Sequence, residues 1–241
     1  MITGLNILLL GFLGLATSRR LQRDLGDIVY WGLIAKLLGA FALGFVYHYV
    51  WEGGDTSALH HAVVEHNANY SGSIGRFFRG LLSPIDWMAG NPRSVFFTRV
   101  LSPVGWLTGH NYWLMSGYLA VFSFWCTWLL IRTLIKQYPD AKWACIIGLG
   151  FLPSYIFWSS GFLKDTLANA CAAYIAAVVL SSLWSRTIRW KRLPLALLLF
   201  LILVFTRHYL AGMVLLVLSL AVAGELLSGQ RWAIRLLALS V

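Results

Sequence analysis

The amino-acid sequence predicts an all-α, polytopic integral membrane protein built as a helical bundle. Of its 241 residues, 59% are hydrophobic and only 12% are charged, and the mean hydropathy is +0.72. A soluble domain has about 25% charged residues. The apolar residues are also gathered into long runs that end at charged residues, which is the pattern of membrane-spanning helices. These observations exclude an ordinary soluble domain.

The apolar runs predict about seven to eight transmembrane helices in a single membrane domain covering residues 1–241. The first run has an Arg cluster after it and no basic residue before it, so we interpret it as a retained anchor. The predicted spans are 2–17, 28–51, 112–135, 143–158, 166–184, 193–206 and 209–227, with an incomplete start at 232–241. That last stretch is too short to cross a bilayer, so we expect either a minimal protein or the front part of a longer polypeptide.

Lys and Arg residues predict which loops face the cytoplasm, because short cytoplasmic loops are enriched in them. This rule puts the amino terminus, the segment 52–111 and the links near 159–165 and 207 on the outer face. Topology therefore accounts for the net charge of +10, and no nucleic-acid partner is predicted. The twelve cations that mark the cytoplasmic face are Arg19, Arg20, Arg23, Arg132, Lys136, Lys142, Arg186, Arg189, Lys191, Arg192, Arg231 and Arg235.

The long outward segment 52–111 is predicted to be partly structured. Two amphipathic helices lying in the membrane interface are expected there, because apolar residues recur at helical spacing beside arginines. They either pack the loop onto the membrane or form a platform that borders a lipid-binding groove. The first contains Phe77, Phe78, Leu81 and Leu82 with Arg76 and Arg79, and the second contains Val95, Phe96, Val100 and Leu101 with Arg93 and Arg99.

Asp55 is the first candidate functional residue. It stands in Gly53-Gly54-Asp55-Thr56, directly after the second predicted span, and the two glycines let the backbone turn tightly and approach a ligand. A carboxylate at this position could act as a general base towards a sugar hydroxyl or hold a metal ion. The structural alternative is that Asp55 or Thr56 caps a helix running through Ala58 and His61.

Lys164 and Asp165 form the second candidate, because they lie at the start of the span that returns from the outer face. Asp165 suits a helix N-terminus electrostatically, whereas a cation does not. A phosphate held by Lys164 and free backbone amides would resolve this conflict. The plainer alternative is that Lys164 pairs with Asp165 or Asp55.

Arg207 is the third candidate, in the tight outward turn Thr206-Arg207-His208-Tyr209. An ionisable group near the membrane surface is costly and is usually paired. A guanidinium group matches phosphate oxygens in a bidentate fashion, which makes Arg207 a candidate phosphate clamp. The alternative is a side chain that reaches towards the interface beside an aromatic belt that includes Tyr209.

The histidines raise the possibility of a divalent metal ion. His48, His60, His61, His66, His110 and His208 all fall in the outer half of the predicted topology. His61, Glu65 and Asp55 could meet around one helical turn, since positions four apart share a helix face. The sequence has no HExxH motif, and outward histidines are more often simple polar surface, so no metal site is assigned.

Four sequence segments together resemble a group of bacterial membrane proteins of the GT-C type of glycosyltransferase, which use polyprenyl-phosphate-linked sugars. The segments are Lys36-Leu37-Leu38-Gly39, Gly53-Gly54-Asp55-Thr56, Pro153-Ser154 through Phe157-Trp158-Ser159-Ser160-Gly161 with Lys164-Asp165, and Arg207. The resemblance implies that Asp55 is a catalytic base or metal ligand and that Lys164 and Arg207 contact the lipid phosphate. Thr56, Asp165 and His208 complete the predicted substrate-binding residues.

The leading hypothesis is therefore an enzyme of the bacterial inner membrane. It would move a sugar from a polyprenyl phosphate carrier to an acceptor at the periplasmic face, with membrane lipid and the carrier as its partners. A polysaccharide polymerase or ligase, which uses a diphosphate carrier, is a close alternative. The rival from another class is a non-catalytic scaffold that packs beside other membrane subunits, as small residues in the apolar runs allow.

Overall fold

The computed structural model describes residues 2–51, 53–70, 73–85, 91–187 and 190–228, and every regular element among them is helical. The α-helices are α1 (Ile2–Leu25), α2 (Ile28–Phe45), α3 (Asp55–Asn69), α4 (Ile74–Leu82), α5 (Pro92–Leu107), α6 (Tyr112–Gln137), α7 (Lys142–Cys145), α8 (Pro153–Trp158), α9 (Lys164–Ser185), α10 (Leu193–Thr206) and α11 (His208–Ser228). Two π-helical turns, η1 (Val46–Val50) and η3 (Ile146–Phe151), and two 3-10 turns, η2 (Pro139–Ala141) and η4 (Trp190–Arg192), complete the elements. The predicted all-α class is confirmed.

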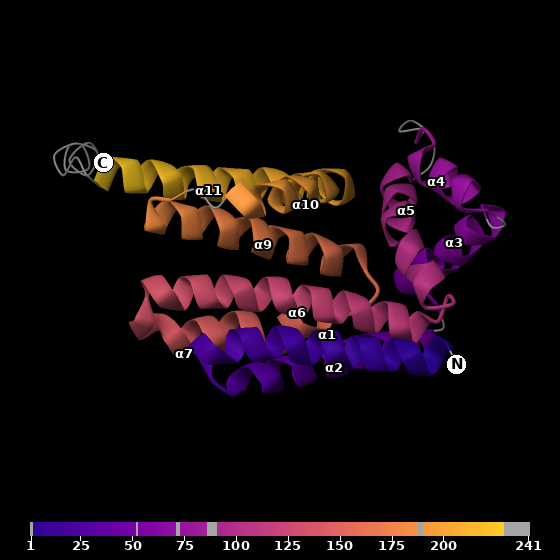
Figure 1. Cartoon of the computed structure of the whole chain (residues 1–241), viewed down its shortest axis with the longest axis horizontal. Coiled ribbons are helices and arrows are strands. Elements are labelled where there is room, and N and C mark those ends of the chain that lie inside the picture. The colour runs from indigo at the N-terminus through magenta and orange to yellow at the C-terminus, as the bar shows by residue number, and fades with distance from the viewer. Residues whose placement is uncertain (1, 52, 71–72, 86–90, 188–189, 229–241) are drawn as a thin grey trace.

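The long helices run side by side as an antiparallel bundle, and α3, α4 and α5 form a unit at one end of it (Figure 1). Helix α6 is central, because it packs against α1, α2 and α9, while α9 packs in turn against α10 and α11. The α3–α5 unit follows the end of α2 and contacts the bundle through η1, α6 and α10. We call this end of the molecule the α3–α5 end.

Two clusters of buried side chains hold these elements together. One lies between α1, α2, α6 and η3, and Trp128 at its centre is completely buried. The other runs without interruption from α3 and α5 through α6 and α9 to α10 and α11. The α3–α5 unit therefore shares its core with the bundle.

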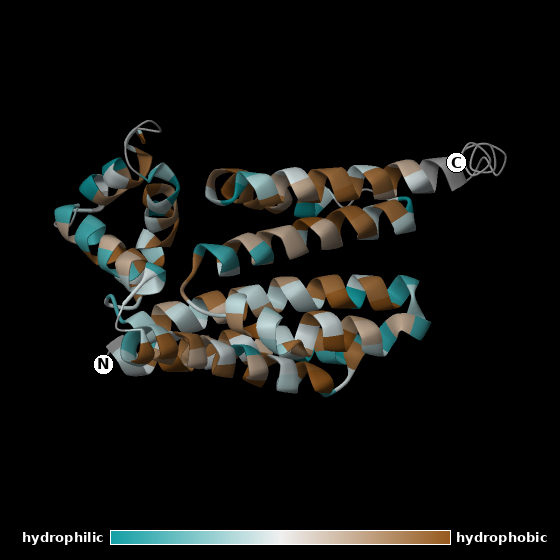
Figure 2. Cartoon of the chain, turned by 180° about the vertical axis from the view of Figure 1, so that it is seen from behind, coloured by the Kyte–Doolittle hydropathy of each residue, from teal (hydrophilic) through white to brown (hydrophobic). Residues whose placement is uncertain are grey.

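The outer surface of the bundle is apolar, the reverse of a soluble protein. Leu8, Phe12, Leu197, Leu216 and Leu220 are each between 62% and 73% exposed. Figure 2 shows hydrophobic residues along the length of the long helices. Contiguous exposed apolar surface of this kind marks contact with a membrane or another protein. Together with the long apolar helices, it indicates a multi-pass membrane protein.

The predicted number of seven to eight transmembrane helices was too high. Among the described residues, three helices are long and apolar enough to cross a membrane, namely Ile28–Val50, Tyr112–Gln137 and Lys164–Ser185. The segment 143–158 is divided into α7, η3 and α8, since Pro153 begins a new helix. Helix α10 has 14 residues, which rise only about 21 Å. A bilayer core is about 30 Å thick.

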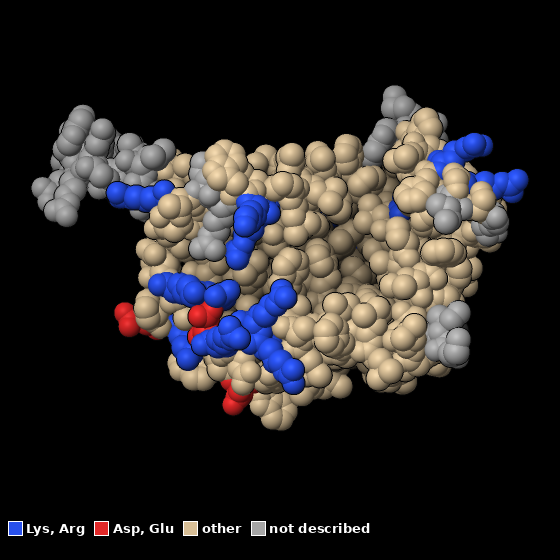
Figure 3. All heavy atoms as spheres, viewed as in Figure 1, with Lys and Arg blue, Asp and Glu red and all other residues tan. Residues whose placement is uncertain are grey.

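The helices of the bundle nevertheless alternate regularly in direction. Successive apolar segments run up and down the bundle, so the ends of α1, α6 and α9 and the start of α10 meet at the end opposite α3–α5 (Figure 1). Lys and Arg side chains gather at this end, which we call the cationic end (Figure 3). Arg189, Arg231, Arg235 and the segment 232–241 lie outside the described residues.

Both helices expected in the outward segment are present as α4 and α5. Helix α4 has Ser73 as its N-cap, whose hydroxyl accepts a hydrogen bond from the backbone N–H of Arg76 at 3.1 Å. Helix α5 begins at Pro92 after an Asn91 N-cap. Phe97 and Leu101 of α5 are buried, so this helix is part of the core rather than a helix with a wholly membrane-facing apolar side.

Candidate functional site

Charged side chains from four parts of the chain converge at the α3–α5 end. Lys164 at the start of α9 is the centre of this group, which we call the charged cluster. Asp55 of α3, Arg93 of α5, Asp165 of α9 and Arg207 between α10 and α11 all lie close enough to interact electrostatically with Lys164. Three cations and two carboxylates thus meet here, with an excess of one positive charge.

Arg207 and Asp165 form a bidentate ion pair inside this cluster. The Nε atom of Arg207 lies 2.8 Å from Oδ1 of Asp165, and Nη2 donates to Oδ2 at 2.9 Å. The Arg207 guanidinium carbon also lies 5.8 Å from the centre of the Tyr209 ring. The Nη2 hydrogen bond and the close Nε–Oδ1 contact together hold the guanidinium against the carboxylate. Arg207 is therefore both paired with Asp165 and placed beside Tyr209.

Lys164 does not form the ion pair with Asp165 or Asp55 that one sequence-based alternative expected. Its Nζ atom donates to the Ser94 hydroxyl of α5 at 3.1 Å. Within the described residues it makes no ion pair of 4.0 Å or less with Asp55 or Asp165. The side chain is half-buried, so it links α9 to α5 while its charge still faces the cluster.

Asp55 is the first residue of α3 and is exposed. Gly53 and Gly54 before it have φ angles of 138° and 121°, a region that favours glycine. Gly54 is the N-cap, so the predicted capping by Asp55 or Thr56 is wrong, although the helix through Ala58 and His61 is present. In the described part of the chain, no hydrogen bond or ion pair engages the Asp55 carboxylate.

Two further predicted substrate-binding residues occupy contrasting positions. Thr56 is completely buried, and its hydroxyl lies 2.9 Å from the hydroxyl of Tyr112. This contact joins α3 to the start of α6, so the Thr56 side chain is turned into the protein. His208 is exposed at the start of α11, with its ring 6.0 Å from that of Tyr209.

The residues of the metal alternative do not assemble. His61 and Glu65 are both exposed on α3. Across the ranges that the structure describes, no group of three or more His, Cys, Asp or Glu side chains is arranged to hold a metal ion. The charged cluster is thus defined by cations and carboxylates from different elements.

Lys36 holds the end of α8 in place, a role that the sequence analysis did not assign. It is completely buried within the bundle, and its Nζ atom lies 3.1 Å from the Ser123 hydroxyl and 3.1 Å from the Ser159 carbonyl. It also donates to the Ser159 hydroxyl and lies 4.8 Å from the centre of the Tyr155 ring. Three oxygen acceptors match the three donors of an ammonium group. Lys36 therefore anchors the link between α8 and α9, which leads to Lys164.

A second missed feature is a polar network that fixes the α3–α5 unit. The Asn67 amide donates to the Ser102 carbonyl at 3.0 Å and lies 2.9 Å from Nε2 of His110. Nε2 of His60 lies 2.8 Å from the His110 carbonyl oxygen. Burial lowers the pKa of His60, which favours its neutral form. His110 has a φ of 62°, a value that spacing in the sequence does not reveal.

An apolar cavity of about 360 Å³ lies close to the charged cluster. Leu167, one helical turn beyond Lys164, lines it together with Leu101 and Val104 of α5. Leu13 of α1 and Trp125 of α6 line it from the other side. Figure 3 shows the surface hollowed where α5 approaches the bundle. A hydrocarbon chain could therefore lie next to the charged cluster.

Comparison with known proteins identifies no relative. No family model matches the sequence, and no curated protein or solved structure matches it either. The functional argument consequently depends on the chemistry of the residues themselves. That chemistry is an accessible carboxylate beside an excess of cations, at one end of an apolar helical bundle and next to an apolar cavity.

Proposed function

We propose that the protein binds a polyprenyl-phosphate-linked sugar at its outer face and transfers the sugar to an acceptor hydroxyl, as the resemblance to GT-C glycosyltransferases implies. The observation that carries this proposal is the convergence of Asp55, Lys164 and Arg207 on one cluster. These residues come from three separate parts of the chain. An excess of positive charge there suits a phosphate, and an accessible carboxylate suits proton transfer.

The apolar cavity is the observation that supports a lipid-linked substrate. It is lined by residues of α1, α5, α6 and α9, and it begins about one turn from Lys164. A polyprenyl chain in this cavity would bring its phosphate towards Lys164, Arg93 and Arg207. The second predicted amphipathic helix, α5, would then form one wall of a lipid-binding groove, as one sequence-based alternative expects.

The chemistry requires one base and a cationic clamp. The acceptor oxygen attacks the anomeric carbon of the sugar, the bond from that carbon to the phosphate oxygen breaks, and the acceptor proton passes to Asp55. The departing phosphate keeps the bonding electrons and needs no proton. Lys164 and Arg207 stabilise the charge that develops on it. Asp165 orients the Arg207 guanidinium, and Ser94 holds the Lys164 ammonium.

The proposed mechanism also requires a particular orientation of the protein in the membrane. The α3–α5 end would face the periplasm and the cationic end the cytoplasm of a bacterial cell, according to the positive-inside rule. Helices α10 and α11 would lie beside the three long spans in the inner membrane, and α10, with its 14 residues, would reach only part of the way through the bilayer core. Arg207, which joins α10 to α11, would then lie at the outer membrane surface.

The test compares Asp55→Asn with Glu65→Gln, a matched loss of charge at an exposed position of the same helix. Both variants are reconstituted with radiolabelled polyprenyl-phosphate sugar and a panel of acceptors. Asp55→Asn should lower transfer by about 10²- to 10⁴-fold, the usual contribution of a general base, with little change in carrier binding. Glu65→Gln should retain wild-type transfer. Equal activity of the two variants would remove Asp55 from the mechanism.

A scaffold function is the second candidate, and the Arg207–Asp165 pair favours it. The two side chains form an ion pair with each other, so the charges also serve to join α9 to the α10–α11 link. Arg207→Ala distinguishes the two functions. Loss of carrier binding by a folded variant supports transfer, whereas loss of folded protein or of an associated membrane subunit supports the scaffold.

A further inference from the structure

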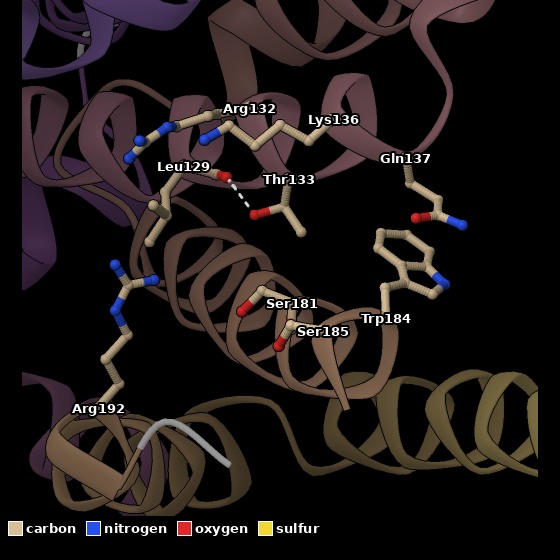
Figure 4. Close-up of a pocket in the computed structure, with 9 residues that line it drawn as sticks. All are labelled: Leu129, Arg132, Thr133, Lys136, Gln137, Ser181, Trp184, Ser185 and Arg192. Carbon is tan, nitrogen blue, oxygen red and sulfur yellow. Dashed lines mark hydrogen bonds between the residues drawn. The ribbon is translucent and has the colours of Figure 1, made fainter. Parts of the chain in front are cut away.

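A second cavity lies at the cationic end, far from the charged cluster along the bundle. Its volume is about 280 Å³, and it opens between α6, α9 and the start of α10. Figure 4 shows Arg132 and Lys136 of α6 on one side and Arg192 on another, with Ser181 and Ser185 of α9 facing the space between them. The proposed transfer reaction does not use any of these residues.

The charge around this cavity is unbalanced. Asp24 of α1 pairs with Arg132 and lies 3.6 Å from Nζ of Lys136, so one carboxylate serves two cations. Arg192 of η4 also lines the cavity. Among the described residues, no Asp or Glu lines the cavity itself. The cavity is therefore suited to an anion.

The shape of the site distinguishes it from an ordinary cytoplasmic loop rich in cations. Side chains that only obey the positive-inside rule can extend separately into water, whereas these three line one cavity between helices. Arginine can bind two phosphate oxygens at once, and lysine supplies a compact charge. The Ser181 and Ser185 hydroxyls donate to backbone carbonyls of α9, and either can rotate away from its carbonyl to donate to a third phosphate oxygen.

Aromatic side chains indicate the depth of the cavity in a membrane. Trp184 lines it, and its ring lies 5.6 Å from the Tyr138 ring in an edge-to-face contact. Trp143 and Trp190 at the same end are 62% and 71% exposed. Tryptophan and tyrosine collect at the level of lipid headgroups. Basic pockets between helices at this level are the sites that bind acidic headgroups.

We propose that this cavity binds the phosphate of an anionic phospholipid in the cytoplasmic leaflet. The volume of about 280 Å³ lies just below the roughly 300–1,000 Å³ of pockets for drug-sized ligands, so it suits a smaller group such as a phosphate with its glycerol. The acyl chains remain in the bilayer outside the bundle. Such a lipid would join α6, α9 and α10 at their cationic ends. The inference depends on membrane insertion and not on the proposed sugar transfer.

The experiment measures binding of dioleoylphosphatidylglycerol to the detergent-solubilised protein by native mass spectrometry and by the shift in Tm. Wild type should bind this lipid and not dioleoylphosphatidylcholine. Lys136→Gln with Arg192→Gln should weaken binding about 25-fold, since each cation near a headgroup contributes about 1 kcal/mol, or about fivefold. Arg19→Gln with Arg20→Gln removes two exposed cations of the same end outside the cavity, and should change binding by no more than about twofold.

A third variant keeps every charge. Ser181→Leu fills the cavity and should lower lipid binding as strongly as loss of the cations does. This variant keeps the proposal testable if the charge variants do not fold. Equal binding by wild type and Ser181→Leu would overturn the site. Glycerol 3-phosphate and inorganic phosphate are the soluble probes. If either raises the Tm as much as the lipid does, the ligand is a soluble phosphate compound and the lipid assignment is wrong.

Discussion

At the level of single residues, the ion pair between Arg207 and Asp165 is the contact that bears most directly on phosphate binding. Their ion pair has an Nε–Oδ1 contact of 2.8 Å and one hydrogen bond, from Nη2 to Oδ2, of 2.9 Å, and it links the start of α9 to the α10–α11 turn. The side chains are 25% and 40% exposed, so solvent weakens the interaction. A phosphate at the charged cluster would compete with Asp165 for Arg207. The strength of the ion pair therefore decides how readily Arg207 exchanges Asp165 for a phosphate.

A double-mutant cycle with Arg207→Gln and Asp165→Asn measures this strength. We expect a coupling of about 1 kcal/mol in the free energy of unfolding in detergent, the upper range for an exposed ion pair. Arg93→Gln combined with Asp165→Asn is the control, because these residues form no hydrogen bond with each other, and its effects should add to within about 0.5 kcal/mol. Strict additivity of the first pair would show that the ion pair does not stabilise the fold.

His60 makes stability depend on pH. Burial lowers its pKa, while the hydrogen bond to the His110 carbonyl acts in the opposite direction and the nearby His48, His61 and His110 reinforce the effect of burial. The unfolded chain binds this proton at about pH 6.5. The stability that His60 contributes is therefore complete above that pH and is lost as the pH falls through the lower pKa of the folded protein.

The Tm should accordingly decrease between pH 7.5 and pH 5. His60→Gln should flatten this decrease, because the side chain no longer titrates. His61→Gln on the exposed side of the same helix should leave it nearly intact. A smaller dependence of Tm on pH should remain in His60→Gln, because the pKa of His66 is also lowered, by burial and by Arg99. Parallel pH curves for His60→Gln and wild type would contradict this explanation.

At the level of elements, close packing of α2 against α6 depends on a glycine. A Cβ atom at Gly32 would lie 2.1 Å from the Trp128 ring, and Trp128 is completely buried. Gly32→Ala should therefore lower the free energy of unfolding by about 1–3 kcal/mol, the usual cost of overpacking. Gly11→Ala in α1 meets no atom within 4 Å and should be neutral or slightly stabilising. Denaturation in detergent compares the two variants, and equal stability would show that α2 can move away from α6.

The elements that the sequence predicts well are those with a strong periodic pattern. Helices α4 and α5 were expected from apolar residues at helical spacing beside arginines, and both are present. The segment 143–158 was predicted as one span because its residues are apolar throughout. Pro153 and the π-helical turn η3 divide it. Hydropathy reports the polarity of side chains and therefore does not detect these changes in backbone geometry.

The charged cluster was predictable in part. Scarce charged residues at the ends of apolar runs pointed to Asp55, Lys164 and Arg207, because an ionisable group at a membrane surface needs a reason to be there. The partners were not predictable. The contacts Lys164–Ser94 and Thr56–Tyr112 each join residues more than 50 positions apart, so they depend on how the helices dock. The sequence patterns describe single helices and contain no such information.

At the level of the whole molecule, the two ends have different chemistry. The α3–α5 end combines exposed Asp55 with the charged cluster, whereas the cationic end presents many Lys and Arg side chains around a cavity (Figure 3). An asymmetric distribution of cations orients a membrane protein with its cationic end in the cytoplasm. Both proposals depend on this orientation, because one requires an outer site and the other an inner lipid.

Single cysteines read by an impermeant thiol reagent test the orientation. Ala58 of α3 and Thr187 beyond α9 are both exposed and lie at opposite ends of the bundle. Cys126 and Cys171 are buried, and Cys145 is replaced by Ser to remove background labelling. In intact cells, Ala58→Cys should react and Thr187→Cys should not, while permeabilised cells should allow both to react. Labelling of Thr187→Cys alone would invert the protein, place Asp55 in the cytoplasm and refute sugar transfer at the outer face.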